Sequence, residues 1–284
     1  MDWGTARFVE CADVKGRAVK LWLRESGRVD APPLLLLHGL GITGLTWKWV
    51  AEELGGRFRL LAPDLPGFGR SDKPSFLDAT GEGVAAVVVG LLDALGLPSV
   101  TLVGHSMGGG ISLATAVLHP KRVSGLVLMG AAALDQPVPP AIRYARLPLA
   151  AWAIRLMPPA WLALGYLDAY HRPQRDTRDV VRAYVSSLRS GRGPEGYVRA
   201  ARALRYDRFR TIAERIPSVC CPTLLLHGAR DRVVPPWVPE RLSHEIPQAR
   251  LTLLPEVGHM PQEETPSEVA RLLSAWSACI PCEP

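Results

Sequence analysis

The first 130 residues alternate short apolar runs with longer stretches of helical periodicity. Leu34–Leu37 is the clearest run, because four consecutive leucines are typical of a strand that is buried on both faces. Strands separated by helices pair in parallel, since the chain must cross back over the sheet. The alternation therefore predicts an α/β fold, with a mostly parallel sheet and helices on both faces. We expect an edge strand at Val19–Leu23, further strands at Leu34–Leu37, Arg59–Ala62, Val100–Val103 and Val123–Met129, and helices at Leu45–Leu54, at Thr80–Leu95 and up to about Leu118.

The alternation stops at about residue 131. From there to about residue 217 no run resembles a strand, and helical stretches broken by proline appear instead. We therefore expect an α/β core of residues 1–130 and 218–284, interrupted by a helical cap of residues 131–217. Such an insert lies over the carboxyl edge of the sheet, where open α/β sheets bind ligands. After the insert we expect strands at Thr223–Leu226 and Arg250–Leu254 and helices at about 239–245 and 266–278.

Composition excludes several classes of protein. With 48% apolar and 21% charged residues among 284, the chain is globular rather than disordered. No apolar stretch approaches the roughly 20 residues of a membrane span. The N-terminus lacks the basic and apolar regions of a secretory signal, so we expect a cytoplasmic protein. The net charge of +6 does not by itself indicate nucleic acid, because no zinc finger, basic arm or RNA-binding aromatic motif accompanies it.

Cysteine and asparagine usage adds two weaker expectations. The five cysteines are scattered and odd in number, so a disulfide framework is not expected. Cys279 and Cys282 have the spacing of half a zinc site, but no second ligand pair accompanies them, and we expect no metal. The chain contains no asparagine and four glutamines, which fits a thermophilic source and a GC-rich genome equally well. The oligomeric state is not indicated.

Gly104-His105-Ser106-Met107-Gly108 is a G-x-S-x-G sequence between an expected strand and an expected helix. In that context the motif forms a sharp turn that exposes a nucleophilic serine. Glycine fits at both ends because the two backbone segments approach closely. The hydroxyl stands at a helix N-terminus, where the dipole favours negative charge. Ser106 is therefore the candidate nucleophile.

A serine nucleophile needs a general base that is itself oriented by an acid. His259 follows the last expected strand, and Asp231 follows the strand before it. Both residues should therefore reach the carboxyl edge of the sheet, where Ser106 also lies. Asp135, which follows the strand at Val123–Met129, is the alternative acid.

With these motifs in this order, the sequence resembles the α/β-hydrolase superfamily, and within it the capped bacterial esterases. The resemblance implies an oxyanion hole made by the backbone N–H groups of Leu40 and Met107. It also implies a substrate pocket that Val234 and Met260 help to line. Histidines such as His38 and His105 fix loops in this family. The segments that carry the resemblance are His38–Gly41, Asp64–Asp72, Gly104–Gly109, Gly228–Asp231 and Gly258–His259.

The insert has two halves of different composition. The first is apolar and aromatic, and its residues either pack helices onto the core or form the inner wall of a pocket. We assign Trp152 to the pocket. The second half is rich in arginine, and the four-residue spacing of Arg178 and Arg182 is typical of a solvated helix face. Attraction of anionic substrates or of a membrane surface is the alternative.

These residues predict acyl transfer that needs no metal or organic cofactor. We expect a small-molecule partner, namely a carboxylic ester of small to medium size that is moderately apolar. C–C hydrolases of the meta-cleavage type are an alternative, although Gly41-Ile42-Thr43 and Met260 differ from their usual Gly-Pro-Gly loop and tryptophan after the catalytic histidine. Cofactor-free perhydrolases or haloperoxidases share the same three residues. A ligand receptor on the same scaffold is the non-enzyme alternative.

Overall fold

The computed structural model describes residues 3–174, 176–204 and 210–278, so Cys279 and Cys282 lie outside the described residues. The core is an eight-stranded sheet with the order β1-β2-β4-β3-β5-β6-β7-β8. The first two strands pair antiparallel, as do β2 and β4, and all other neighbours are parallel. The strands are β1 (Thr5–Ala12), β2 (Ala18–Ser26), β3 (Pro33–Leu37), β4 (Arg59–Pro63), β5 (Val100–His105), β6 (Val123–Met129), β7 (Thr223–Gly228) and β8 (Ala249–Leu254).

The mostly parallel sheet confirms the fold class, but the expectation of an edge strand at Val19–Leu23 is wrong. That segment is part of β2, which pairs with β4 on one side and with β1 on the other. The edge is β1, where Val9 and Cys11 are buried and Glu10 between them is exposed. Hydrogen bonding to β2 along its whole length stabilises β1, so a long apolar run is not required.

Helices cover both faces of the sheet, and β3 shows why its leucine run is continuous. Leu35 and Leu37 pack into a cluster with α2, α3 and α10, whereas Leu34 and Leu36 pack into a second cluster with α1 and α12. Successive residues of a strand point to opposite faces, so a strand between two helical layers must be apolar throughout. The helices are α1 (Lys48–Leu54), α2 (Gly81–Ala94), α3 (Met107–Leu118), α10 (Trp237–Glu245), α11 (Pro261–Glu264) and α12 (Pro266–Ser277), with short 3₁₀ turns at Gly44–Trp47, Pro120–Arg122 and Ile216–Ser218.

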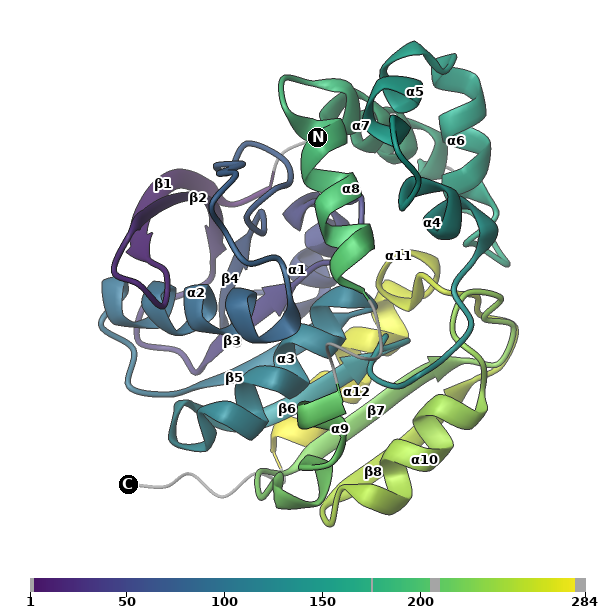
Figure 1. The fold of residues 1–284 in the computed structure, drawn as a ribbon. Helices are drawn as coiled ribbons and strands as arrows, with labels where there is room; N and C mark the ends of the chain where they lie inside the picture. The colour runs from purple at the N-terminus through teal and green to yellow at the C-terminus, as the bar shows by residue number, and fades with distance from the viewer. Residues whose placement is uncertain (1–2, 175, 205–209, 279–284) are drawn as a thin grey trace.

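The chain between β6 and β7 is helical, and its described residues contain no strand. Helices α4 to α8 gather together beyond the sheet, at the top of the view in Figure 1. The inner faces of α7 and α8 are buried, whereas α6 contains no buried residue. Among the described residues, no helix is long and apolar enough to cross a membrane. These helices are α4 (Pro140–Ala145), α5 (Ala150–Leu156), α6 (Pro159–Leu167), α7 (Thr177–Arg189), α8 (Gly193–Ala203) and α9 (Arg210–Ala213).

Candidate active site

Ser106 occupies the sharp turn between β5 and α3. Its φ of 53° and ψ of −117° lie in a region that side-chain-bearing residues rarely adopt. The flanking glycines make the turn possible: a Cβ on Gly104 would lie 2.4 Å from the carbonyl oxygen of Gly108, and one on Gly108 would lie 2.3 Å from that of Leu37. The strained turn therefore holds the serine at the N-terminus of α3, above the carboxyl end of the sheet.

The structure brings the three sequence-predicted residues together. His259 Nε2 lies 3.0 Å from Ser106 Oγ, and His259 Nδ1 lies 2.8 Å from Asp231 Oδ2. With the Nδ1 proton donated to the carboxylate, Nε2 is left as an acceptor for the serine proton. Asp231 is itself fixed, because its Oδ1 accepts the backbone N–H groups of Val233 at 2.7 Å and Val234 at 2.9 Å.

The electrostatic surroundings keep Asp231 ionised. Burial raises the pKa of this carboxyl, but the charge and hydrogen bond of His259 and the Val234 N–H outweigh it, so the pKa lies below its ordinary value. Asp135, the alternative acid, is an exposed residue on the cavity rim and has no recorded contact with the imidazole. The contacts therefore favour Asp231 as the partner of His259.

The residues whose amides are expected to form an oxyanion hole line the same cavity as Ser106. Among the described residues, the backbone hydrogen bonds of turns, loops and helix caps use neither the Leu40 N–H nor the Met107 N–H as a donor. The His38 ring holds the Leu40 loop: its Nδ1 donates to the Gly39 carbonyl at 2.8 Å, and its Nε2 accepts the Leu65 N–H at 2.8 Å. Complete burial lowers the pKa of His38 to about 4, so the ring is neutral near pH 7.

His105 supports the other side of the site. Its Nε2 donates to the backbone carbonyl of His259 at 2.7 Å, and burial lowers its pKa to about 3. The rings of His38 and His105 therefore act as neutral braces for the two loops that flank Ser106.

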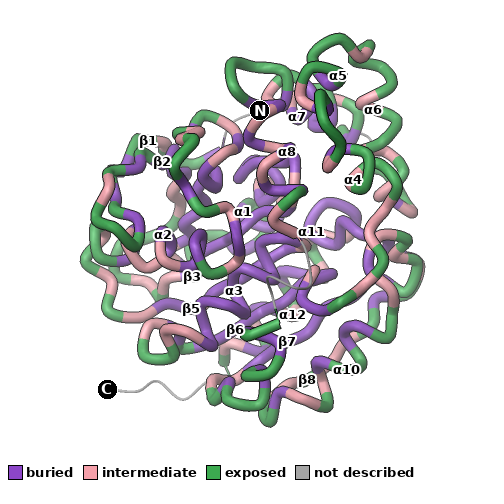
Figure 2. The backbone as a smooth tube through the Cα atoms, in the orientation of Figure 1, coloured by how far each residue is buried: buried purple, intermediate pink, exposed green. Residues whose placement is uncertain are grey.

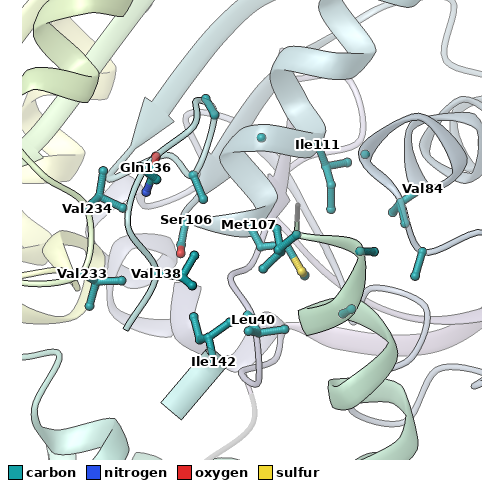
Figure 3. Close-up of a pocket in the computed structure, with 18 of the residues that line it drawn as sticks. Leu40, Val84, Ser106, Met107, Ile111, Gln136, Val138, Ile142, Val233 and Val234 are labelled. Carbon is teal, nitrogen blue, oxygen red and sulfur yellow. The ribbon is translucent and has the colours of Figure 1, made fainter. Parts of the chain in front are cut away.

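A cavity of about 600 Å³ opens beside Ser106. Its walls come from the sheet core, from the segment after β6 and from α8, and they are mainly apolar. In Figure 3 the Ser106 hydroxyl points toward Val138 and Ile142 across the cavity. The lining also includes Leu40 and Met107, so the candidate oxyanion donors, the nucleophile and the apolar walls adjoin the same space.

The family of the chain follows from comparison with known proteins. The model of the alpha/beta hydrolase family matches residues 34–272. The chain belongs to the α/β-hydrolase family. A 2-hydroxymuconate semialdehyde hydrolase of Pseudomonas sp. (strain CF600) is 31% identical over 252 residues, covering 87% of each chain.

Two solved structures of relatives also superpose on this hydrolase. A thermophilic esterase from Thermogutta terrifontis has a TM-score of 0.81 and 29% identity, covering 98% of this chain and 99% of the esterase. A meta-cleavage product hydrolase from Pseudomonas fluorescens IP01 has a TM-score of 0.78 and 25% identity, covering 96% of this chain and 97% of the other. Relatives of this hydrolase therefore include proteins from both of the leading reaction classes that the sequence left open.

Of the three expected pocket residues, the structure places one in the lining. Val234 lines the cavity. Met260 is buried in the cluster on the other side of the sheet, because the imidazole of His259 turns toward Ser106 and the next side chain turns away. Trp152 is 61% exposed and lies outside the described lining, since α5 presents Ala150 and Ile154 inward instead.

Sequence reasoning missed Glu264, a buried carboxylate on α11. Its Oε1 accepts the N–H groups of Gly258 at 3.0 Å and Met260 at 3.2 Å, on either side of His259. Its Oε2 accepts those of His171 at 2.9 Å and Arg172 at 2.8 Å, which belong to the insert. The hydrolase thus uses one carboxylate to join the His259 loop to the insert. The only sequence signal is an acidic residue five positions after the histidine.

Glu263, the neighbour of Glu264 on α11, is also buried. Its oxygens accept the hydroxyls of Thr46 at 2.5 Å, Tyr170 at 2.6 Å and Tyr184 at 2.6 Å. Burial raises the pKa of Glu263, and the three hydroxyl donors act in the opposite direction. Because Tyr170 and Tyr184 belong to the insert and Thr46 to the core, this carboxyl also bridges the two parts of the hydrolase.

Gly130 is a second residue that sequence reasoning missed. It directly follows β6, the last strand before the insert, and has a φ of +48°. A Cβ at this position would lie 3.1 Å from Asp231 Oδ2 and 3.2 Å from His259 Nδ1. The absence of a side chain therefore leaves room for the imidazole–carboxylate pair.

Proposed function

We propose that this α/β-hydrolase cleaves carboxylic esters, with Ser106 as nucleophile, His259 as general base and acid, and Asp231 as the acid that orients the imidazole. The observation that carries the proposal is the continuous hydrogen-bonded chain from Ser106 Oγ through His259 to Asp231, at 3.0 and 2.8 Å. These distances allow proton transfer from the hydroxyl as it attacks a carbonyl carbon.

In the first half-reaction, Ser106 Oγ bonds to the ester carbonyl carbon while His259 Nε2 takes the hydroxyl proton. The carbonyl oxygen becomes an oxyanion, which the N–H groups of Leu40 and Met107 stabilise by about 3 kcal/mol each. His259 then gives its proton to the departing alkoxide, and an acyl-enzyme remains. Next, His259 takes a proton from a water molecule, whose oxygen attacks the acyl carbon. The bond to Ser106 Oγ then breaks, the carboxylic acid leaves, and His259 returns the proton to the Ser106 hydroxyl.

We propose further that residues 131–217 act as a cap that completes the substrate site. The cavity lining supports this division, because it combines Leu40 and Val84 of the core with Val138, Ile142 and Ala200 of the insert. These side chains are apolar, and a volume of about 600 Å³ suits esters of small to medium size.

C–C bond hydrolysis of meta-cleavage products is the second candidate, because relatives of that kind match the chain over nearly its whole length. Perhydrolysis uses the same three residues. The apolar walls near Ser106 support the ester proposal over a substrate with several charges.

The test is turnover of p-nitrophenyl esters from acetate to octanoate by the wild type and by Ser106→Ala, with a meta-cleavage product assayed beside them. We expect ester turnover that Ser106→Ala abolishes and much slower turnover of the C–C substrate. Ester turnover that survives Ser106→Ala would reject the nucleophile. If the C–C substrate is turned over faster than the esters, the protein is a C–C bond hydrolase rather than an esterase. Binding without any turnover would indicate a receptor.

A further inference from the structure

The cap exposes an unusual number of large apolar side chains. Within residues 144–164, seven of them are between 54% and 76% exposed, whereas the remaining exposed large apolar residues of the described chain are scattered. Isolated exposed apolar residues are ordinary, but a concentration of them marks an interaction site. Figure 2 shows that α4, α5 and α6 lie together and that most of their residues are exposed. We call this set the apolar cap surface: Tyr144, Leu147, Leu149, Trp152, Leu156, Trp161 and Leu164.

The helices present this surface outward rather than into the core. On α5, Ala150 and Ile154 are buried, while Trp152 and Leu156, four residues apart, face outward. All nine residues of α6 are uncharged and none is buried, although the sequence PAWLALGYL would suit a protein interior. A helix with this composition normally packs against something. The inner face of α6 packs against the core, but its outward face, with Trp161 and Leu164, has no partner among the described residues.

Leu149, between α4 and α5, combines an unusual backbone conformation with high exposure. Its φ is +62°, in the left-handed region, where a leucine is strained, and its side chain is the most exposed of the seven.

The charge of the cap indicates the chemistry of that partner. Residues 131–217 hold fifteen arginines, no lysine and seven acidic residues, a net charge of +8, so the rest of the chain carries −2. From residue 140 to residue 167 the only charged residues are Arg143, Arg146 and Arg155. A second copy of the chain would bring two strongly positive caps together, which charge repulsion disfavours. An anionic surface complements the whole cap.

We propose that the apolar cap surface docks the protein onto an anionic lipid bilayer surface. Exposed tryptophans and leucines that enter the headgroup region, with arginines around them, are the features by which proteins lie on such a surface without spanning it. Helix α4 links the docking surface to the cavity, since Ile142 lines the cavity and Tyr144 belongs to the surface. The docking does not depend on the proposed reaction, because no step of hydrolysis is needed for it.

The test is co-sedimentation of the full-length protein with vesicles of phosphatidylglycerol and phosphatidylcholine, and with vesicles of phosphatidylcholine alone. We expect binding to the anionic vesicles that weakens as salt is raised, and quenching of tryptophan emission by brominated lipid. Leu156→Ser/Leu164→Ser should lower the partition coefficient about tenfold or more. Val14→Ser/Val29→Ser, at two equally exposed apolar positions outside the cap, should change it less than twofold.

Two controls separate docking from folding and from catalysis. Both double variants should hydrolyse a soluble short-chain ester like the wild type, or, if no such hydrolysis exists, retain its circular dichroism and melting temperature. Ser106→Ala should bind vesicles as well as the wild type does. Equal vesicle binding by the two double variants, or no binding of the wild type to anionic vesicles, would overturn the proposal. Self-association of the wild type that Leu156→Ser/Leu164→Ser abolishes, without vesicle binding, would assign the surface to a dimer and also overturn it.

Discussion

Replacing Glu264 by glutamine removes one carboxylate oxygen and changes almost nothing else in size. The carboxylate accepts four backbone N–H groups, two at each oxygen: Oε1 accepts Gly258 and Met260 from the His259 loop, and Oε2 accepts His171 and Arg172 from the insert. A glutamine keeps one acceptor oxygen, but its NH₂ group would then face two N–H donors. These donors belong to the backbone and cannot rotate to become acceptors. In either orientation of the amide, two hydrogen bonds are lost.

The cost follows from the number and kind of bonds. A hydrogen bond to a charged group contributes about 1.5–3 kcal/mol, so the loss of two should lower the free energy of unfolding by about 3–6 kcal/mol. Two of the donors flank His259, so the loop should also shift. A displacement of about 1 Å at a catalytic group can cost about 100-fold in rate. We therefore expect kcat to fall about 100-fold, with a small change in KM, because Glu264 does not line the cavity.

Glu263→Gln is the matched control, since Glu263 is the neighbouring buried carboxyl and accepts only hydroxyls. A tyrosine or threonine hydroxyl can rotate and accept from the new NH₂ group, so this change should cost only about 1 kcal/mol. Urea unfolding gives the stability of each variant, and initial rates on a p-nitrophenyl ester give kcat and KM. If Glu264→Gln and Glu263→Gln lower kcat equally, or if kcat of Glu264→Gln stays within about threefold of the wild type, the positioning role is refuted.

Three further predictions concern the rest of the site. Asp231→Asn should lower kcat about 10⁴-fold with the fold intact, whereas Asp135→Asn should stay within a few-fold; the reverse result would exchange their roles. The pKa of His38 is about 4 in the folded protein, compared with an ordinary value of 6.5 for a histidine in the unfolded chain. As pH falls, the unfolded chain therefore binds a proton at His38 before the folded protein does, and stability is lost between pH 6.5 and pH 4. The loss is about 3 kcal/mol, and urea unfolding across that range should show a shallower decline for His38→Gln. Gly108→Ala should lower the melting temperature and abolish ester turnover, because its Cβ would meet the Leu37 carbonyl oxygen at 2.3 Å; a melting temperature equal to that of the wild type would contradict the close-approach argument.

The fold was predictable where burial alone dictates residue type. The leucines of β3 contact helices on both faces, and such a strand leaves a continuous apolar run that can be read without a structure. The β1 strand has two buried residues and depends on its pairing with β2, a long-range interaction that no local window contains. The same reasoning explains why Val19–Leu23 was misplaced at an edge: its true neighbour was not visible in the sequence.

The site was predictable where a residue is required by chain geometry. Gly104 and Gly108 are dictated by backbone contact at the turn, and so they mark Ser106. The cap offers no comparable constraint, because every face of α6 is apolar and periodicity cannot say which face turns inward. Trp152 was assigned to the pocket for this reason and instead faces outward. Glu264 was invisible because two of its four donors lie more than 90 positions away in the chain.

The contacts that attach the insert to the core bear on how substrate reaches the cavity. Glu263 and Glu264 fix the α6–α7 end of the cap to α11, and His259 itself donates its backbone N–H to the Ala169 carbonyl at 2.8 Å. Because these contacts hold the His259 loop, we expect that end to stay in place while substrate enters. The segment at residues 135–142 lines the other side of the cavity and is exposed or half-buried, and within the described chain no carboxylate anchors it in this way. We therefore expect substrate to enter past this segment, because its movement would leave the hydrogen-bonded chain of Ser106, His259 and Asp231 intact.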